Sequence, residues 1–182
     1  MKAFRDFIKT YKKNDPAART TLEIVLTYPG VWAVGYHRVA HYLYHYNFKL
    51  VARMLSMFAR WLTGIEIHPG ATVGRRLFID HGMGVVIGET AVIGDDVIIF
   101  HGVTLGGRGD ETGKRHPTVE DGVLLSAHAQ IIGNVTIGKQ AKIGANAVVL
   151  NDIPEGVTAV GIPAKIVKTR QENEQSLPAD EE

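Results

Sequence analysis

The fold is decided by residues 131–149, which read IIGNVTIGKQAKIGANAVV. A branched aliphatic residue returns at every sixth position of this stretch, at Ile131, Ile137, Ile143 and Val149. A period of six fits neither the 3.6-residue turn of an α-helix nor the simple alternation of a strand. It is typical of a β-helix, in which each hexapeptide forms one of three flat sides and points its aliphatic residue into a stacked core.

The same period extends towards the N-terminus in three phased blocks. After Val85 the register slips by two residues, and a polar excursion over residues 106–118 separates the second block from the third. Glycine often follows the aliphatic residue, where a tight corner would need a positive φ. The aliphatic positions are Ile67, Val73, Ile79 and Val85, then Ile87, Ile93, Ile99 and Leu105, then Val119, Leu125, Ile131, Ile137, Ile143 and Val149.

Residues 1–63 lack this period and are predicted to form a small α-helical region. Apolar spacing indicates helices over residues 3–13, 31–46 and 48–63, and Asp15-Pro16 is interpreted as an N-cap followed by proline at the first helical position. The β-helix is assigned to residues 64–168. The acidic segment 169–182 carries almost no apolar residues and is expected to be disordered.

The composition excludes several classes of protein. The formal net charge is only +1, which speaks against a nucleic-acid partner. The absence of cysteine excludes disulfides and thiolate metal sites. The charged N-terminus does not resemble a signal peptide, and no uncharged apolar run is long enough for a membrane span. A soluble protein acting in the cytoplasm, with no membrane partner, is expected.

The candidate functional residues are those that break the rules of the repeat. Asp80-His81 occupies a corner where glycine or a plain polar residue would suffice, and Arg115-His116 ends the excursion that Gly106-Gly107 begins. A lone corner histidine is usually just solvated. Two histidines, each beside a charged residue and on either side of an irregular loop, favour a functional site.

Other histidines and one amphipathic stretch have structural interpretations. His37, His41 and His45 share one helix face at spacing i, i+4, i+8, which could bind a metal, but a partly exposed stripe that packs on the coil or on another subunit is the favoured interpretation. Residues 48–61 could lie on a membrane surface, although packing on the β-helix or on a partner subunit is favoured. His68, His101 and His128 occupy repeat positions without an obvious partner.

Four segments resemble serine O-acetyltransferases of the hexapeptide-repeat acyltransferase family, in a short bacterial form. The resemblance runs from about Asp15 to Lys165 and is far more specific than the repeat alone. It implies a left-handed parallel β-helix and transfer of acetyl from acetyl-CoA to the hydroxyl of L-serine, giving O-acetyl-L-serine in cysteine biosynthesis. The segments are IEIHPGA at 65–71, IDHGMGVVIGET at 79–90, GVTLGG at 102–107 and KRHP at 114–117.

The resemblance also implies residue roles. His81 is expected to be the general base, with Glu66 orienting it and His116 beside the reacting groups. Asp15, Asp80 and Arg115, together with His116, are expected to hold the amino acid. Acetyl-CoA is expected as co-substrate, with no permanently bound cofactor and no metal. Its contacts are expected at Gly106, Gly107, Ala127, Ala145 and Lys165.

The resemblance further implies a homotrimer with the acetyl-CoA groove between neighbouring β-helices, and trimers that pair through the helical region. Some family members dock a C-terminal isoleucine into O-acetylserine sulfhydrylase, the next enzyme of cysteine synthesis. This chain ends in Asp180-Glu181-Glu182, so that complex is not expected.

Three alternatives stay open. A sugar O-acetyltransferase would share His81 and the acetyl-CoA groove, but a sugar has no ammonium or carboxylate for Asp15, Asp80 and Arg115 to bind. A β-helical carbonic anhydrase could use His81 and His116 as zinc ligands, but residues 117–127 contain no third histidine. A non-catalytic scaffold would not need the histidines beside the loop.

Overall fold

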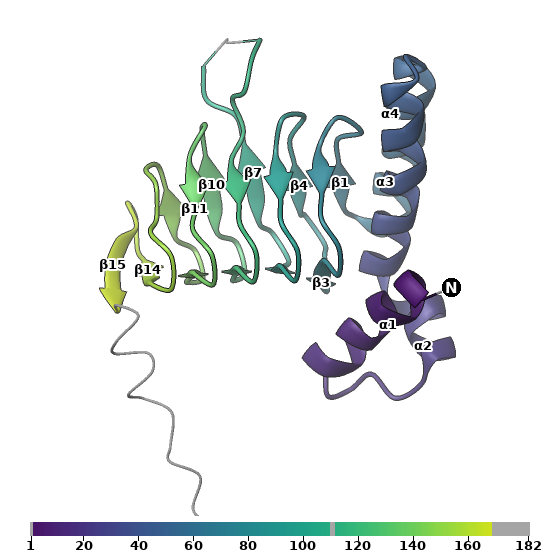
Figure 1. Ribbon diagram of the computed structural model, residues 1–182, viewed down its shortest axis with the longest axis horizontal. Coiled ribbons are helices and arrows are strands. Elements are labelled where there is room, and N and C mark those ends of the chain that lie inside the picture. Colours follow the sequence, from purple (N-terminus) through teal and green to yellow (C-terminus); the bar gives the residue numbers. More distant parts are fainter. Residues whose placement is uncertain (1, 110–111, 169–182) are drawn as a thin grey trace, which may run out of the picture.

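The computed structural model describes residues 2–109 and 112–168 and contains a helical region joined to a β-helix (Figure 1). The helices are α1 (Lys2–Asn14), α2 (Thr21–Thr27), α3 (Pro29–His45) and α4 (Lys49–Thr63). The strands are β1 (Glu66–Ile67), β2 (Thr72–Val73), β3 (Phe78–Asp80), β4 (Val86–Ile87), β5 (Val92–Ile93), β6 (Ile98–Phe100), β7 (Thr104–Gly106), β8 (Thr118–Val119), β9 (Leu124–Leu125), β10 (Gln130–Ile132), β11 (Thr136–Ile137), β12 (Lys142–Ile143), β13 (Val148–Val149), β14 (Thr158–Val160) and β15 (Lys165–Lys168). The acidic segment 169–182 lies outside the described residues.

The strands stack into three parallel sheets around about five coils, as the hexapeptide period predicts. The first sheet has the order β1-β4-β7-β10-β13, the second β11-β8-β5-β2 and the third β15-β14-β12-β9-β6-β3, in which only β15 runs antiparallel to its neighbour. The repeated aliphatic residues form the core, where Ile87, Leu105 and Ile131 lie above one another, fully buried. Burying each such side chain stabilises the fold by about 1.5–3 kcal/mol.

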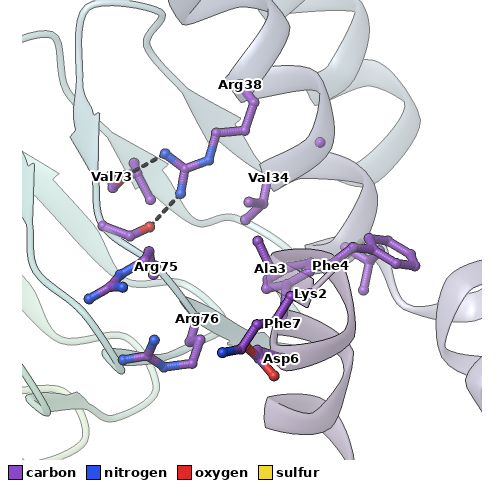
Figure 2. A pocket seen from close by; sticks show the side chains of 13 residues that line it. Lys2, Ala3, Phe4, Asp6, Phe7, Val34, Arg38, Val73, Arg75 and Arg76 are labelled. Carbon is purple, nitrogen blue, oxygen red and sulfur yellow. Dashed lines mark hydrogen bonds between the residues drawn. The ribbon is translucent and has the colours of Figure 1, made fainter.

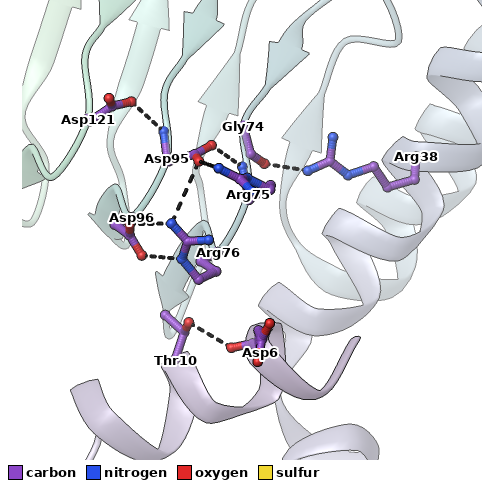
Figure 3. A network of polar contacts seen from close by, with 9 residues as sticks. All are labelled: Asp6, Thr10, Arg38, Gly74, Arg75, Arg76, Asp95, Asp96 and Asp121. Carbon is purple, nitrogen blue, oxygen red and sulfur yellow. Dashed lines mark hydrogen bonds and ion pairs between the residues drawn. The ribbon is translucent and has the colours of Figure 1, made fainter. Parts of the chain in front are cut away.

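Three kinds of corner join the sheets. We call the turns from the third sheet to the first the His81 corner, those from the first to the second the loop corner, and those from the second to the third the arginine corner. At the arginine corner Arg75 and Arg76 pair with Asp95 and Asp96 of the next coil (Figure 3), with contacts of 2.7 Å for Arg75–Asp95 and 2.5 Å for Arg76–Asp96. Asp121 of the following coil accepts a hydrogen bond from the Asp95 amide at 2.8 Å, so polar contacts continue from coil to coil.

The slip of two residues in the sequence period has a local cause. Asp80 pairs with Phe100 and Val86 with Thr104. Five residues, 81–85, therefore connect β3 to β4, where three residues, 101–103, connect β6 to β7. The first His81 corner is wider than the next by two residues, and the widened turn contains His81 itself.

The helical region covers the open end of the first coil. Side chains of α3 and α4 donate hydrogen bonds to carbonyl groups that no further coil can reach: His37 Nε2 to Ala71 at 3.1 Å, His41 Nδ1 to Pro69 at 2.8 Å and Ser56 to Ile67 at 2.7 Å. His37 and His41 of the histidine stripe thus pack on the coil, whereas His45 is exposed and contacts His41. Burial lowers the pKa of His37 to about 4, so it stays neutral while donating. Among the described residues no helix is long and apolar enough to cross a membrane.

One prediction for the helical region is wrong. Asp15 and Pro16 do not start a helix: they lie in the turn after α1, and α2 begins later, at Thr21. Thr20 is the N-cap, because its hydroxyl accepts from the Glu23 amide while the Glu23 carboxylate faces the Thr20 amide, a reciprocal capping box. Asp15 closes the preceding turn instead, accepting from the Ala17 amide at 2.8 Å.

Candidate functional site

His81 projects from the widened corner between β3 and β4. Its backbone φ is +57°, in the left-handed region that most residues avoid, and its side chain is 74% exposed. Nε2 lies 3.6 Å from the Asp80 carboxylate, which is an ion-pair distance but too long for a hydrogen bond. An exposed imidazole on a strained turn, beside a carboxylate, is suited to proton transfer with a bound molecule.

The Asp15 carboxylate belongs to the same neighbourhood. Tyr28 donates a hydrogen bond to it at 2.5 Å, and this bond, followed by that of the Ala17 amide, lowers the pKa of Asp15. The Tyr28 ring packs on Tyr11 with centroids 5.6 Å apart, and Tyr11 packs on Phe78 of β3 at 4.9 Å, so Asp15 is held beside the strand that ends at Asp80. Asp15 and Asp80 therefore lie on the same side of the molecule as His81, and their binding of an ammonium group stays a prediction.

Arg115 and His116 lie at the loop corner, where Glu89 organises the charges. Arg115 Nη2 contacts one Glu89 oxygen at 2.6 Å, and Tyr44 of α3 donates to the other at 2.8 Å. The bond from Arg115, and then that from Tyr44, lowers the pKa of Glu89. Glu89 thus links the Arg115 guanidinium to Tyr44 of α3. Glu89 is a residue that the sequence did not single out as functional.

His116 is oriented by Thr90. The Thr90 amide donates to His116 Nδ1 at 3.2 Å, and an amide can only donate, so this nitrogen carries no proton. Burial, followed by the charge of Arg115, lowers the pKa of His116, which favours the neutral ring. A neutral ring with a bare Nδ1 carries its proton on Nε2. His116 is therefore a hydrogen-bond donor at Nε2.

The two clusters do not come together within one chain. The His81 corner leads into β4 and the loop corner leaves it, so the width of the first sheet separates Asp15, Asp80 and His81 from Arg115 and His116. In Figure 1 the excursion loop rises from the upper edge of that sheet, whereas β3 lies at the lower edge. The residues predicted to form one site are two half-sites on opposite edges of the same sheet.

Glu66, predicted to orient His81, has other partners in the structure. Its carboxylate oxygens contact Arg53 at 2.9 Å and Arg60 at 3.0 Å, and its side chain is only 15% exposed. These ion pairs join α4 to β1. The carboxylate in contact with His81 is that of Asp80, so an orienting role for Glu66 stays a proposal.

The residues predicted to contact acetyl-CoA are spread over three places. Ala127 and Ala145 lie at the His81 corner of later coils, Gly106 and Gly107 open the excursion loop, and Lys165 begins β15. The carbonyl of Gly106 accepts from the Gly133 amide at 2.9 Å, which ties the start of the loop to the next coil. A long ligand could reach the two alanines along the helix axis, because the Asn146 amide bonds the Ala127 carbonyl and so stacks the two corners.

All three histidines that have no obvious partner in the sequence have a contact in the structure. The His101 ring packs between those of His81 and His128, with centroids 5.9 and 5.0 Å away. His68 Nδ1 accepts from the Gly70 amide at 3.0 Å, and its ring contacts Tyr44. The two-residue slip in the sequence period was the signal that could have indicated the contact between His81 and His101, because the widened corner brings His81 over the corner of the next coil.

A pocket of about 820 Å³ lies away from both half-sites, between α1, α3 and the arginine corner (Figure 2). Phe4, Phe7 and Val34 form apolar walls, and the cation Arg38 donates to the Val73 carbonyl at 2.6 Å. None of the predicted site residues lines it. Volume alone therefore does not identify the functional site of this chain.

We expect Glu89→Gln to weaken the binding of a carboxylate-bearing substrate, because the neutral amide cannot hold Arg115 as an ion pair. The apparent KM for that substrate should rise by about 3–30-fold, equivalent to about 0.7–2 kcal/mol. Steady-state kinetics with each substrate varied in turn measures the change. Glu120→Gln, a partly exposed carboxylate at the arginine corner whose hydrogen bond from the Lys139 amide a glutamine oxygen can accept, is the matched control, and an equal effect on both substrates would contradict the assignment.

Several known proteins are similar to this chain along most of its length. Residues 116–151 match the family described as bacterial transferase hexapeptide (six repeats). A serine acetyltransferase of Bacillus subtilis (strain 168) is 53% identical over 180 residues, which cover 96% of this chain and 83% of that protein.

Two solved structures are similar along most of the chain. A serine acetyltransferase from Brucella abortus strain S19 in complex with coenzyme A has a TM-score of 0.88 at 43% identity, covering 91% of this chain and 67% of that one. One from Neisseria gonorrhoeae in complex with serine has a TM-score of 0.88 at 42% identity, covering 92% and 68%.

Proposed function

The chain belongs to the serine acetyltransferase family and is an acyltransferase that acetylates the hydroxyl of L-serine, and we propose that it takes the acetyl group from acetyl-CoA at a site completed by a second copy of itself. The product is O-acetyl-L-serine, in cysteine biosynthesis. The observation that carries the proposal is the placement of acidic and basic half-sites on opposite edges of one sheet. We also propose that it acts in the cytoplasm.

His81 is the proposed general base. A neutral imidazole can accept the serine hydroxyl proton as the oxygen attacks the thioester carbonyl. The same ring then returns that proton to the departing CoA thiolate, so the base ends the cycle neutral. The high exposure of His81 leaves room for both substrates, and the Asp80 carboxylate lies 3.6 Å from its Nε2.

The substrate charges match the two half-sites. Asp15 and Asp80 suit the ammonium group of serine, and Arg115 suits its carboxylate in a bidentate pair. His116, with its proton on Nε2, can donate to the same carboxylate or to the developing oxyanion. Since one chain holds these groups apart, we propose that Arg115 and His116 come from a neighbouring copy.

A closed trimer fits this requirement, because each copy would give its His81 corner to one neighbour and its loop corner to the other. Mixing tests it. Homo-oligomers of His81→Asn and of Arg115→Ala should both be nearly inactive. Random 1:1 co-assembly should restore about a quarter of the wild-type rate. Each mixed trimer contains one interface at which an unchanged His81 from one copy meets an unchanged Arg115 from the other. Activity is measured after co-expression, with separately purified and unmixed variants as the control. No recovery in verified mixed trimers would contradict a shared site.

The outer face of α4 supports the further proposal that two trimers pair through the helical region. The buried face of α4 is made of small residues, Ala52, Ser56, Ala59 and Thr63. On the opposite face of α4, Leu50 is 74% exposed and Trp61 is 79% exposed. Exposure of such large apolar side chains to water is unfavourable unless a partner covers them. Light scattering should give a mass of three or six chains, and a fully active monomer would contradict both proposals.

An acceptor screen tests the proposed function directly. Acetyl-CoA is supplied with L-serine, homoserine or sugars, and release of the CoA thiol is followed with a thiol reagent. L-serine should be strongly preferred. A sugar O-acetyltransferase would reverse this order, and it would leave the charges of Asp15, Asp80 and Arg115 without a purpose. Among the described residues no group of three histidine or acidic side chains is placed so that it could hold a metal ion, as a zinc-dependent anhydrase would require.

A further inference from the structure

Three imidazole rings stand in a row along the His81 corner of three consecutive coils. The His81 and His101 centroids are 5.9 Å apart with an interplanar angle of 77°, and those of His101 and His128 are 5.0 Å apart at 88°. Both contacts are edge-to-face, the arrangement that aromatic rings prefer. The row begins at the proposed base, and its other members, His101 and His128, have no part in the function proposed above.

The backbone around the row is arranged to hold it. The Gly102 amide bonds the Met83 carbonyl and the His128 amide bonds the His101 carbonyl, each at 2.9 Å, so the three corners are stacked. The His128 ring occupies the space where a side chain at residue 102 would be, since a Cβ added to Gly102 would lie 2.2 Å from His128 Nδ1. Gln130 completes the support by donating to the Gly102 and His128 carbonyls at 3.1 Å.

The proposed base needs such support, because its own polar contact does not orient it. The Asp80 carboxylate is too far from Nε2 for a hydrogen bond, and the ring is largely exposed. A side chain in that position would sample several rotamers, and general-base catalysis depends on the nitrogen facing the substrate hydroxyl. His101 Nδ1 is buried without a hydrogen-bond partner among the described residues, so His101 offers His81 a ring surface and not a fixed polar bond.

We infer that His101 is a positioning residue for the base: its ring, backed by that of His128, restricts the His81 imidazole to the orientation that accepts the serine proton. This rests on the proposed function of His81. Since the contact is ring packing, an aromatic residue without nitrogen should substitute for His101 better than an amide of similar length.

The test uses His101→Ala, His101→Phe and His101→Gln in the full-length enzyme, with Lys139→Ala, an exposed position in a turn at the arginine corner, as a matched control. We expect His101→Ala to lower kcat by about tenfold while the KM values for serine and acetyl-CoA change less than threefold. His101→Phe should restore at least half of the wild-type kcat, and His101→Gln should not. A purely structural role would lower the melting temperature and the amount of assembled enzyme without this pattern in kcat.

Two further variants keep the inference open to contradiction if His101→Ala does not fold. His128→Asn keeps a residue that tolerates the positive φ of +59° but removes the backing ring, and should lower kcat by about two- to fourfold. In a His81→Asn background, loss of the His101 ring should have no further effect on the residual rate. An unchanged kcat in His101→Ala or His128→Asn, or additive losses with His81→Asn, would overturn the inference. An active His81→Asn enzyme would instead overturn the proposed function.

Discussion

His81→Ala should lower kcat by about 10²–10⁴-fold, the usual contribution of a general base, while the oligomer stays assembled. The imidazole lies on a surface corner, so its removal leaves the stacked aliphatic core intact. The KM for acetyl-CoA should change little, because binding of the donor does not depend on the proton acceptor. Steady-state release of the CoA thiol measures the rate.

The control must separate loss of the base from strain in the turn. Residue 81 has a φ of +57°, where alanine is disfavoured by about 1 kcal/mol and asparagine is better tolerated. His81→Asn should therefore fold as well as the wild type and be as inactive as His81→Ala. His45→Ala, which removes an exposed imidazole from α3, should keep the rate. Most of the wild-type rate in a folded His81→Asn enzyme would exclude a general base at this position.

The β-helix could be predicted from sequence because its core is a one-dimensional pattern. Each aliphatic position, such as Ile131, lies over the equivalent residue of the neighbouring coil. The period of six therefore predicts both the fold and the register of the strands. The two-residue slip after Val85 even marked the corner that carries His81. The helices were predictable from apolar spacing, whereas the start of α2 was not, because the Thr20–Glu23 capping box competes with the apparent N-cap at Asp15.

The candidate site was predictable as a set of residues but not as an arrangement. The period shows that Asp80-His81 and Arg115-His116 break the repeat, but it does not show that they occupy opposite edges of one sheet. The Glu89 contacts with Arg115 and Tyr44 depend on how α3 packs against the coil, a long-range feature that no local pattern reports. For the same reason the sequence could not show Glu66 paired with Arg53 and Arg60.

Arg115→Ala should damage the use of L-serine far more than the use of acetyl-CoA. Removing one partner of a buried charge pair commonly costs about 2–5 kcal/mol, which corresponds to a loss of about 30–5,000-fold in kcat/KM for serine. The guanidinium is only 25% exposed and already held at 2.6 Å from Glu89, so it is oriented before the substrate carboxylate arrives. The KM for acetyl-CoA should stay within about threefold of the wild-type value.

Ethanolamine, which is serine without its carboxylate, makes this prediction specific to the proposed pair. The wild-type enzyme should discriminate strongly against ethanolamine, and Arg115→Ala should lose most of that discrimination, because neither acceptor then finds a guanidinium. Arg75→Ala, which removes an arginine paired with Asp95 at the arginine corner, is the matched control and should preserve the preference for serine. If Arg115→Ala still prefers serine over ethanolamine as strongly as the wild type, then Arg115 does not bind the carboxylate. Equal use of the two acceptors by the wild-type enzyme would favour the sugar O-acetyltransferase alternative, because the charged half-sites would then not recognise an amino acid.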